Sequence, residues 1–184
     1  MPKPVLPSCL LGVVALLAGA PIVAQAPMPP MPPTDAAPDC AAPATLPPPL
    51  AAWTRPVPMA AVGKAGALRR AVLQPDQAVT LALMPTPKVS YPVRPEKPGG
   101  SVSYGGLARF AVTQAGTWRV ALGSGAWIDV VKDGRASVSV AHGHGPECSG
   151  IRKMVDYDLS PGTYALQVAA NGSHSIRLLV TRLP

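Results

Sequence analysis

The feature that most constrains this chain is a series of short segments, from Gln77 onward, in which apolar and polar residues alternate between turn-forming residues. Alternation with a period of two is typical of β-strands that bury one face. The spacing of the segments is typical of sandwiches and jelly rolls. Eight segments show the pattern: 79–83, 108–112, 118–122, 126–131, 135–141, 155–159, 164–168 and 176–180. The sequence therefore predicts an all-β fold, an antiparallel β-sandwich or jelly-roll-like domain of about eight strands.

Two dipeptides mark places where consecutive strands should turn back on each other. Asp133-Gly134 follows the segment 126–131, and Asn171-Gly172 follows the segment 164–168. Both favour the two-residue type I′ hairpin turn, which needs a positive φ at both central positions. Helical patterning is nearly absent. Residues 65–73 (AGALRRAVL) alone predict one short helical turn or an additional edge strand.

The N-terminal residues have the composition of an export signal. Lys3 precedes an apolar stretch over 9–24 that Pro21 interrupts and that is too short to span a bilayer comfortably. We expect residues 1–26 to be a signal peptide, cleaved after Ala26 or after Ala24. This implies a periplasmic or secreted protein without a transmembrane segment in the mature chain.

The next segment is rich in proline and alanine and has almost no periodicity. Proline removes backbone donors and fixes φ, so such a segment favours extended polyproline conformations over helix or sheet. Residues 27–60 are therefore predicted to be a disordered, semi-rigid tether. The β-sandwich domain is expected over 61–184.

The cysteines carry information about the compartment. Cys9 would leave with the signal peptide, so the mature chain keeps Cys40 and Cys148. An even pair in an oxidising compartment favours a disulfide between the tether and a loop of the domain. The alternatives are two unpaired thiols, or a Cys40 that pairs between chains.

The charge pattern excludes one class of partner. The formal net charge is +7, but the basic residues are scattered and are not interleaved with aromatic residues. Nucleic-acid binding normally needs a dense basic patch, and single-strand binding needs stacking aromatics. We expect no nucleic acid as a partner.

One short cluster has metal-binding chemistry. His142 and His144 stand at i and i+2 after a predicted strand, so on an extended chain their side chains share a face. With Glu147 they would form the two-His-one-carboxylate set that leaves open positions on Fe(II), and His174 could supply a third imidazole. The alternative is an exposed His-Gly turn without metal. Asp156 and Asp158 alternate on another strand and are expected to face solvent.

The same cluster resembles the first signature of the cupins, β jelly rolls in which H-x-H is followed by Glu. The spacing differs, because only two residues separate His144 from Glu147, and the second cupin signature is not met in order. The resemblance implies a divalent metal site, with Fe(II) as the first candidate.

Longer strings carry a second resemblance. YPVRPEKPGG (91–100), GSGAWIDVVKD (123–133) and AHGHGPECSGIRKM (141–154) resemble a group of short exported sphingomonad-type β-sandwich proteins. Members of that group often carry the label homogentisate 1,2-dioxygenase, which implies a cupin-like Fe(II) enzyme that opens an aromatic ring. AGTWRV (115–120) and SPGTYAL (160–166) are similar to strands of pre-peptidase C-terminal-type sandwiches, which act as accessory or binding domains.

Two functional hypotheses follow from the sequence. The first is an exported, non-catalytic β-sandwich that binds an envelope component or a small ligand, with no cofactor. The alternative is a metal-binding, Fe(II)-dependent dioxygenase that uses His142, His144 and Glu147. An enzyme site requires the three side chains to converge on one point, whereas a binding module requires a groove or an exposed apolar patch.

Overall fold

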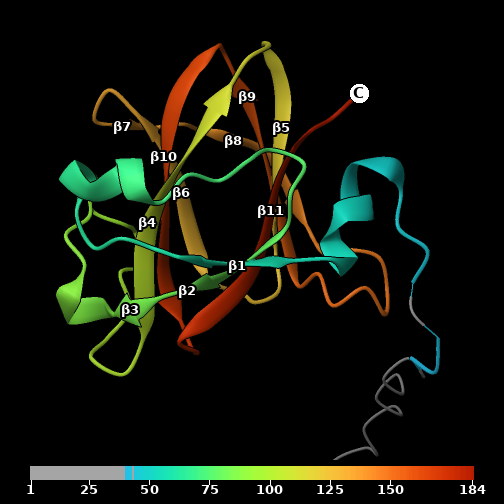
Figure 1. Ribbon diagram of the computed structural model, residues 1–184, viewed down its shortest axis with the longest axis horizontal. Helices are drawn as coiled ribbons and strands as arrows, with labels where there is room; N and C mark the ends of the chain where they lie inside the picture. The colour runs from blue at the N-terminus through green and yellow to red at the C-terminus, as the bar shows by residue number, and fades with distance from the viewer. Residues whose placement is uncertain (1–39, 43) are drawn as a thin grey trace, which may run out of the picture. The chain divides into compact units, whose positions relative to one another are not determined.

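The computed structural model describes residues 40–42 and 44–184 (Figure 1). The predicted signal peptide (1–26) and the first part of the predicted tether (27–39) lie outside the described residues. Within the described part, no helix is both long enough and apolar enough to cross a membrane.

The described residues form two β-sheets that pack face to face, which confirms the predicted all-β sandwich. The first sheet has the strand order β1 (Val57–Ala60), β2 (Val79–Ala82), β11 (Ser175–Arg182), β5 (Gly116–Leu122), β9 (Lys153–Leu159), β8 (Ser139–Gly143). The second sheet has the order β3 (Met84–Pro85), β4 (Tyr104–Val112), β10 (Gly162–Asn171), β6 (Trp127–Lys132), β7 (Arg135–Ala136). Neighbouring strands are antiparallel, except that β1 runs parallel to β2. Three short 3₁₀ helices accompany the sheets: η1 (Pro48–Thr54), η2 (Ala65–Arg70) and η3 (Thr86–Lys88).

Alternate residues of the strands fill the space between the sheets, as the sequence pattern predicts. Phe110 and Tyr164 stack in this core with ring centroids 5.7 Å apart, and Trp118 lies beside Phe110 at 6.4 Å. All three side chains are buried. Large aromatic side chains contribute much of the buried apolar area of a core, so these three residues help to hold the two sheets together.

The described residues form eleven strands, where about eight were expected. β1 and β3 are short edge strands that lie outside the eight predicted segments. The predicted strand 135–141 is divided into β7 and β8, which belong to different sheets, so the chain crosses from the second sheet to the first at residues 137–138. The alternation of apolar and polar residues does not indicate such a crossing. The side chains keep their period of two while the strand changes the neighbour to which its backbone bonds.

The predicted turns have different outcomes. Asp133 and Gly134 both have positive φ, 50° and 73°, as a type I′ turn between β6 and β7 requires. The hairpin predicted at Asn171-Gly172 does not form: the chain turns there, but β10 belongs to the second sheet and β11 to the first, so these two strands do not pair. β10 extends to Asn171 with a bulge, and the positive φ lies at Ala170. The Asn171 side chain holds this connection between the two sheets, because it donates to the Ser173 and Ser175 carbonyls.

The prediction that residues 27–60 form a disordered tether is wrong for 48–60. There η1 buries Leu50 and Trp53 against Ala121 and Leu179 on the outer face of the first sheet. β1 follows and pairs with β2. A 3₁₀ helix has three residues per turn, so apolar residues at i and i+3 share one side. The proline content concealed this short LAAW pattern, and Pro58 is tolerated because β1 is an edge strand.

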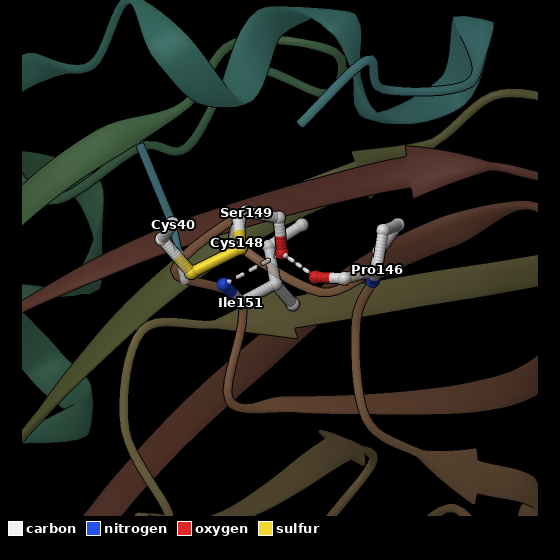
Figure 2. Close-up of a disulfide and its surroundings, with 5 residues drawn as sticks. All are labelled: Cys40, Pro146, Cys148, Ser149 and Ile151. Atoms are coloured by element: carbon white, nitrogen blue, oxygen red, sulfur yellow. Dashed lines mark hydrogen bonds between the residues drawn. A yellow bond between two sulfur atoms is a disulfide. The ribbon is translucent and has the colours of Figure 1, made fainter. Parts of the chain in front are cut away.

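The predicted disulfide is present within one chain. Cys40 and Cys148 are joined across 108 residues of sequence, with Cα atoms 5.2 Å apart (Figure 2). The loop that carries Cys148 is ordered by Ser149, whose hydroxyl donates to the Pro146 carbonyl and accepts from the Ile151 amide. Trp53 Nε1 of η1 also donates to the Ser149 carbonyl at 2.9 Å, so the loop is held by a disulfide to Cys40 and by a hydrogen bond to η1.

Candidate functional site

The four predicted metal ligands do not occupy one site. His142 lies in β8 opposite Val155 of β9 and borders a cavity at the open edge of the sandwich. His144 lies beyond the end of β8, where its Nδ1 is 2.9 Å from the Arg152 carbonyl oxygen in an exposed hydrogen bond. Glu147 is exposed in the turn before Cys148. His174 precedes β11 and makes an edge-on contact with Tyr104, with ring centroids 6.4 Å apart.

Residues 40–42 and 44–184 contain no group of three or more His, Cys, Asp or Glu side chains that could hold a metal ion. The expected convergence of His142, His144 and Glu147 is therefore not found. The i, i+2 rule fails here because the regular strand ends at Gly143 and the chain turns toward Cys148. His174 is separated from β8 by β5 and β9 in the sheet order. The donor set does not fit an Fe(II) centre.

Replacement of His144 by alanine is expected to change the free energy of unfolding by less than about 0.5 kcal/mol, because an exposed side chain with one hydrogen bond adds little to stability. Chemical denaturation of the wild type and the variant measures the difference. A loss of 2 kcal/mol or more would show that His144 holds the 144–152 loop in place.

The cavity that His142 borders has a volume of about 450 Å³, within the range of small-molecule sites. It exists because β7 pairs only with the last two residues of β6, which leaves the rest of that edge of β6 without a strand partner. The buried side chains of Val155, Tyr157 and Ile128 form its apolar part. The remaining lining residues are polar or aromatic: Lys97, Trp127, Asp129, Ser137, Ser139, His142 and Lys153.

Two lysines approach the same tryptophan at this cavity. Lys97 Nζ lies 5.7 Å and Lys153 Nζ lies 5.5 Å from the centroid of the Trp127 ring, within range of a cation–π contact. Lys153 also donates to the Ala126 carbonyl at 3.1 Å. Burial lowers the pKa of Lys153 and the positive charge of Lys97 lowers it further, while Asp129 acts in the opposite direction.

Asp129 is the carboxylate of the cavity, and neutral donors already hold both its oxygens. Trp127 Nε1 donates to Oδ1 and Gln167 Nε2 donates to Oδ2, each at 3.0 Å. The fully buried Gln167 also bonds the amide and the carbonyl of Val93. This network fixes the segment that leads to Lys97 against the second sheet, so it positions one of the two cations of the cavity.

Tyr157 provides a hydroxyl group in the apolar part of the cavity. Its residue is 3% exposed, and burial raises the pKa of its phenol, with a further contribution from the charge of Asp129. Tyr157 lines the cavity. A hydroxyl group that reaches a cavity can bond a ligand or water there.

A second hollow, of about 480 Å³, lies beside Trp53 and Arg177. Three of its polar side chains already have partners. The Arg177 guanidinium lies 5.5 Å from the Trp53 ring centroid, and Ser124 Oγ and Asn171 Oδ1 are bonded at 2.6 Å. These contacts hold η1 and the connection between β10 and β11 in place, so these side chains have a structural role.

Of the residues that line the cavity, only His142 was predicted from the sequence to have a functional role. Lys97, Trp127 and Lys153 come from three separate segments, and their meeting depends on which strand edges remain open. Trp127 was the available signal, since tryptophan on a strand beside charged residues is a frequent binding residue. The chain matches no protein-family model, and no curated protein matches it significantly.

Proposed function

We propose that this chain is an exported, non-catalytic binding module that takes a small ligand in the cavity bordered by His142 and Tyr157. The observation that carries the proposal is the cavity itself: about 450 Å³, with an apolar part and polar side chains that have bonding capacity left. The disulfide between Cys40 and Cys148 supports export, because such bonds persist in oxidising compartments.

The sandwich suits this function because its two sheets hold the cavity walls rigidly. Val155 and Tyr157 lie in β9, which is paired on both sides, by β5 and by β8. Ile128 and Asp129 lie in β6, which β10 pairs along most of its length. A ligand in this cavity would therefore meet a preformed site and would not have to order a loop, which favours affinity.

A fragment titration followed by protein NMR tests the proposal. We expect hits from a chemically diverse set of small molecules to shift the amide signals of residues 127–129, 137–142 and 153–157. Ser139→Phe should abolish these shifts, because Ser139 is opposite Tyr157 and a phenyl ring there would occupy the cavity. Ser101→Phe is the matched control, since Ser101 is exposed in the loop before β4. Hits that bind elsewhere, or that bind the Ser139→Phe variant equally well, would contradict the proposal, as would the absence of hits.

A further inference from the structure

The cavity has an unbalanced positive charge. Lys97 and Lys153 bring two ammonium groups to one tryptophan ring. Burial lowers the pKa of Lys153, and the positive charge of Lys97 lowers it further. In the part of the chain that the structure describes, neither lysine makes an ion pair; the pair that does form joins Arg119 and Asp156. The single carboxylate at the cavity, Asp129, has both oxygens occupied by neutral donors.

Such an arrangement is stabilised by an anion. Two ammonium groups close together repel each other, which costs free energy. A bound anion attracts both of them, and these two attractions offset the repulsion. Lys153 is half-buried, so its interaction with an anion is screened less than that of an exposed lysine. Trp127 holds both side chains near the cavity through its ring, which reduces the side-chain entropy lost on binding.

The rest of the cavity specifies more than charge. Val155, Ile128 and the ring of Tyr157 present an apolar surface next to the two cations. A hydrated inorganic anion would leave that surface empty, whereas an organic anion can place its carbon body there and its charged group at the lysines. Ser137, Ser139 and Tyr157 Oη add hydroxyls that can bond an ether, hydroxyl or second oxygen of the ligand.

We propose that the ligand is a small organic carboxylate, with its carboxylate bound by Lys97 and Lys153 and its body against Val155 and Tyr157. This proposal rests on the proposed binding function and adds the ligand class. The carboxylate accepts charge-assisted hydrogen bonds from the two ammonium groups, and no covalent step is involved.

Matched pairs of acid and amide test the ligand class. Benzoate, hexanoate and cyclohexanecarboxylate are each titrated against the full mature protein by calorimetry, beside benzamide, hexanamide and cyclohexanecarboxamide. Each amide keeps the body of its acid but lacks the charge. We expect at least one acid to bind about tenfold or more tightly than its amide, a difference typical of a hydrogen bond to a charged group. The affinity should fall as sodium chloride is raised.

Lysine variants test the assignment of the residues. Lys153→Gln is expected to weaken binding of the acid about tenfold, and Lys97→Gln about threefold because Lys97 is exposed. Neither variant should weaken binding of the amide. Lys88→Gln is the matched control, because Lys88 is exposed in η3 and does not border the cavity. Lys153 Nζ also donates to the Ala126 carbonyl, so Lys153→Gln could disturb the local fold. Lys97→Gln removes a charge from the same cavity without breaking that bond, and therefore provides a second test.

The outcomes separate this proposal from the proposed function. If every amide binds as tightly as its acid, or if Lys88→Gln weakens binding as much as Lys153→Gln, the carboxylate proposal is overturned. Binding of inorganic phosphate with the same affinity as the best acid would also overturn it, because the apolar body would then contribute nothing. In each of these cases neutral fragments bound in the cavity would still support the binding function. Loss of all binding, fragments included, would overturn both.

Discussion

Replacement of both Cys40 and Cys148 by serine is expected to lower the free energy of unfolding by about 4 to 5 kcal/mol, the chain-entropy value for a closed loop of this size. The bond joins residues 108 positions apart, so in the unfolded state it restricts the segment from Cys40 to Cys148, which is most of the described chain. Denaturation by guanidinium chloride, followed by circular dichroism, measures the change. A total stability of 5 to 15 kcal/mol is usual for a domain, so the variant should unfold at a much lower denaturant concentration.

The serine variant should behave like the reduced wild type. Treatment of the wild type with a thiol reductant should produce the same loss, and the reductant should leave the variant unchanged. A loss below about 1 kcal/mol would mean that the reduced unfolded chain is already compact and that the long loop adds little. Hydrogen exchange at η1 gives a local readout, because only the Trp53 bond to the Ser149 carbonyl and apolar packing would then hold η1 to the loop.

The fold was largely predictable because one face of most strands is buried. The alternation in 118–122 and 176–180 translates directly into Val120 and Val180 facing the core of the first sheet. The Asp133-Gly134 turn was equally readable, since few other residues tolerate positive φ at two consecutive positions. These features depend on neighbours in sequence, which is why a single sequence reports them.

The structure differs from the sequence prediction where contacts join residues that are distant in sequence. η1 is stable because Leu50 and Trp53 meet Ala121 and Leu179, and nothing in the proline-rich segment itself indicates that this surface exists. The division of 135–141 between β7 and β8 depends on the two sheets having adjacent edges. The resulting opening between β6 and β9 creates the cavity. The same division of 135–141 therefore explains why the predicted strand was wrong and why the cavity was not predicted.

The candidate metal site failed for a related reason. Residue types and spacing suggested that His142, His144 and Glu147 could converge, but spacing alone does not say where a strand ends. β8 ends at Gly143, and the following loop is directed by the disulfide and by Ser149. Both histidines are exposed, but His142 lies opposite Val155 and borders the cavity, while His144 bonds the Arg152 carbonyl beyond the end of β8.

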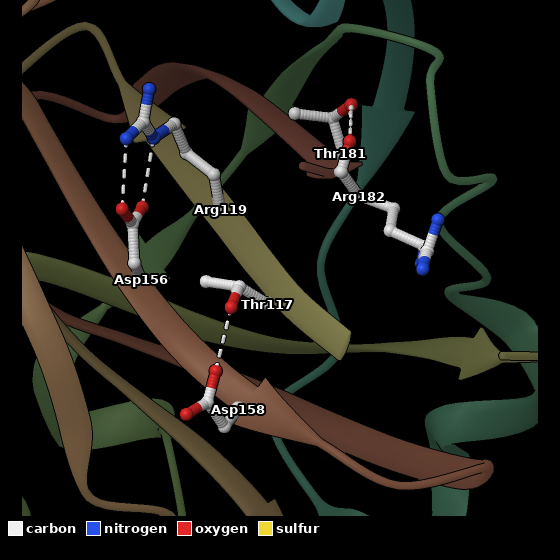
Figure 3. Close-up of polar contacts among 6 residues, drawn as sticks. All are labelled: Thr117, Arg119, Asp156, Asp158, Thr181 and Arg182. Carbon is white, nitrogen blue, oxygen red and sulfur yellow. Dashed lines mark hydrogen bonds and ion pairs between the residues drawn. The ribbon is translucent and has the colours of Figure 1, made fainter. Parts of the chain in front are cut away.

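The expectation that Asp156 faces solvent is also wrong, and its burial sets up a second large effect. Asp156 is 6% exposed on β9 and receives two hydrogen bonds from Arg119 on β5, from Nε to Oδ1 and from Nη2 to Oδ2, each 2.8 Å long (Figure 3). The bond to Asp156 raises the pKa of Arg119. The neighbouring Asp158 is exposed and accepts one bond from Thr117. Alternation placed the two carboxylates on one face correctly but could not distinguish the burial of one from the exposure of the other.

Arg119→Leu should therefore lower the free energy of unfolding by about 3 kcal/mol, because it leaves a buried carboxylate without its partner. The double variant Arg119→Leu/Asp156→Leu should recover most of this loss and lie within about 1 kcal/mol of the wild type, since two packed leucines replace the pair without a buried charge. Denaturant unfolding of the wild type, both single variants and the double variant completes the cycle. Asp158→Ala is the matched control and should cost less than about 1 kcal/mol, as expected for an exposed hydrogen bond. If the double variant is as unstable as Arg119→Leu, the ion pair itself stabilises the packing of β5 on β9, and desolvation of Asp156 is not the dominant cost.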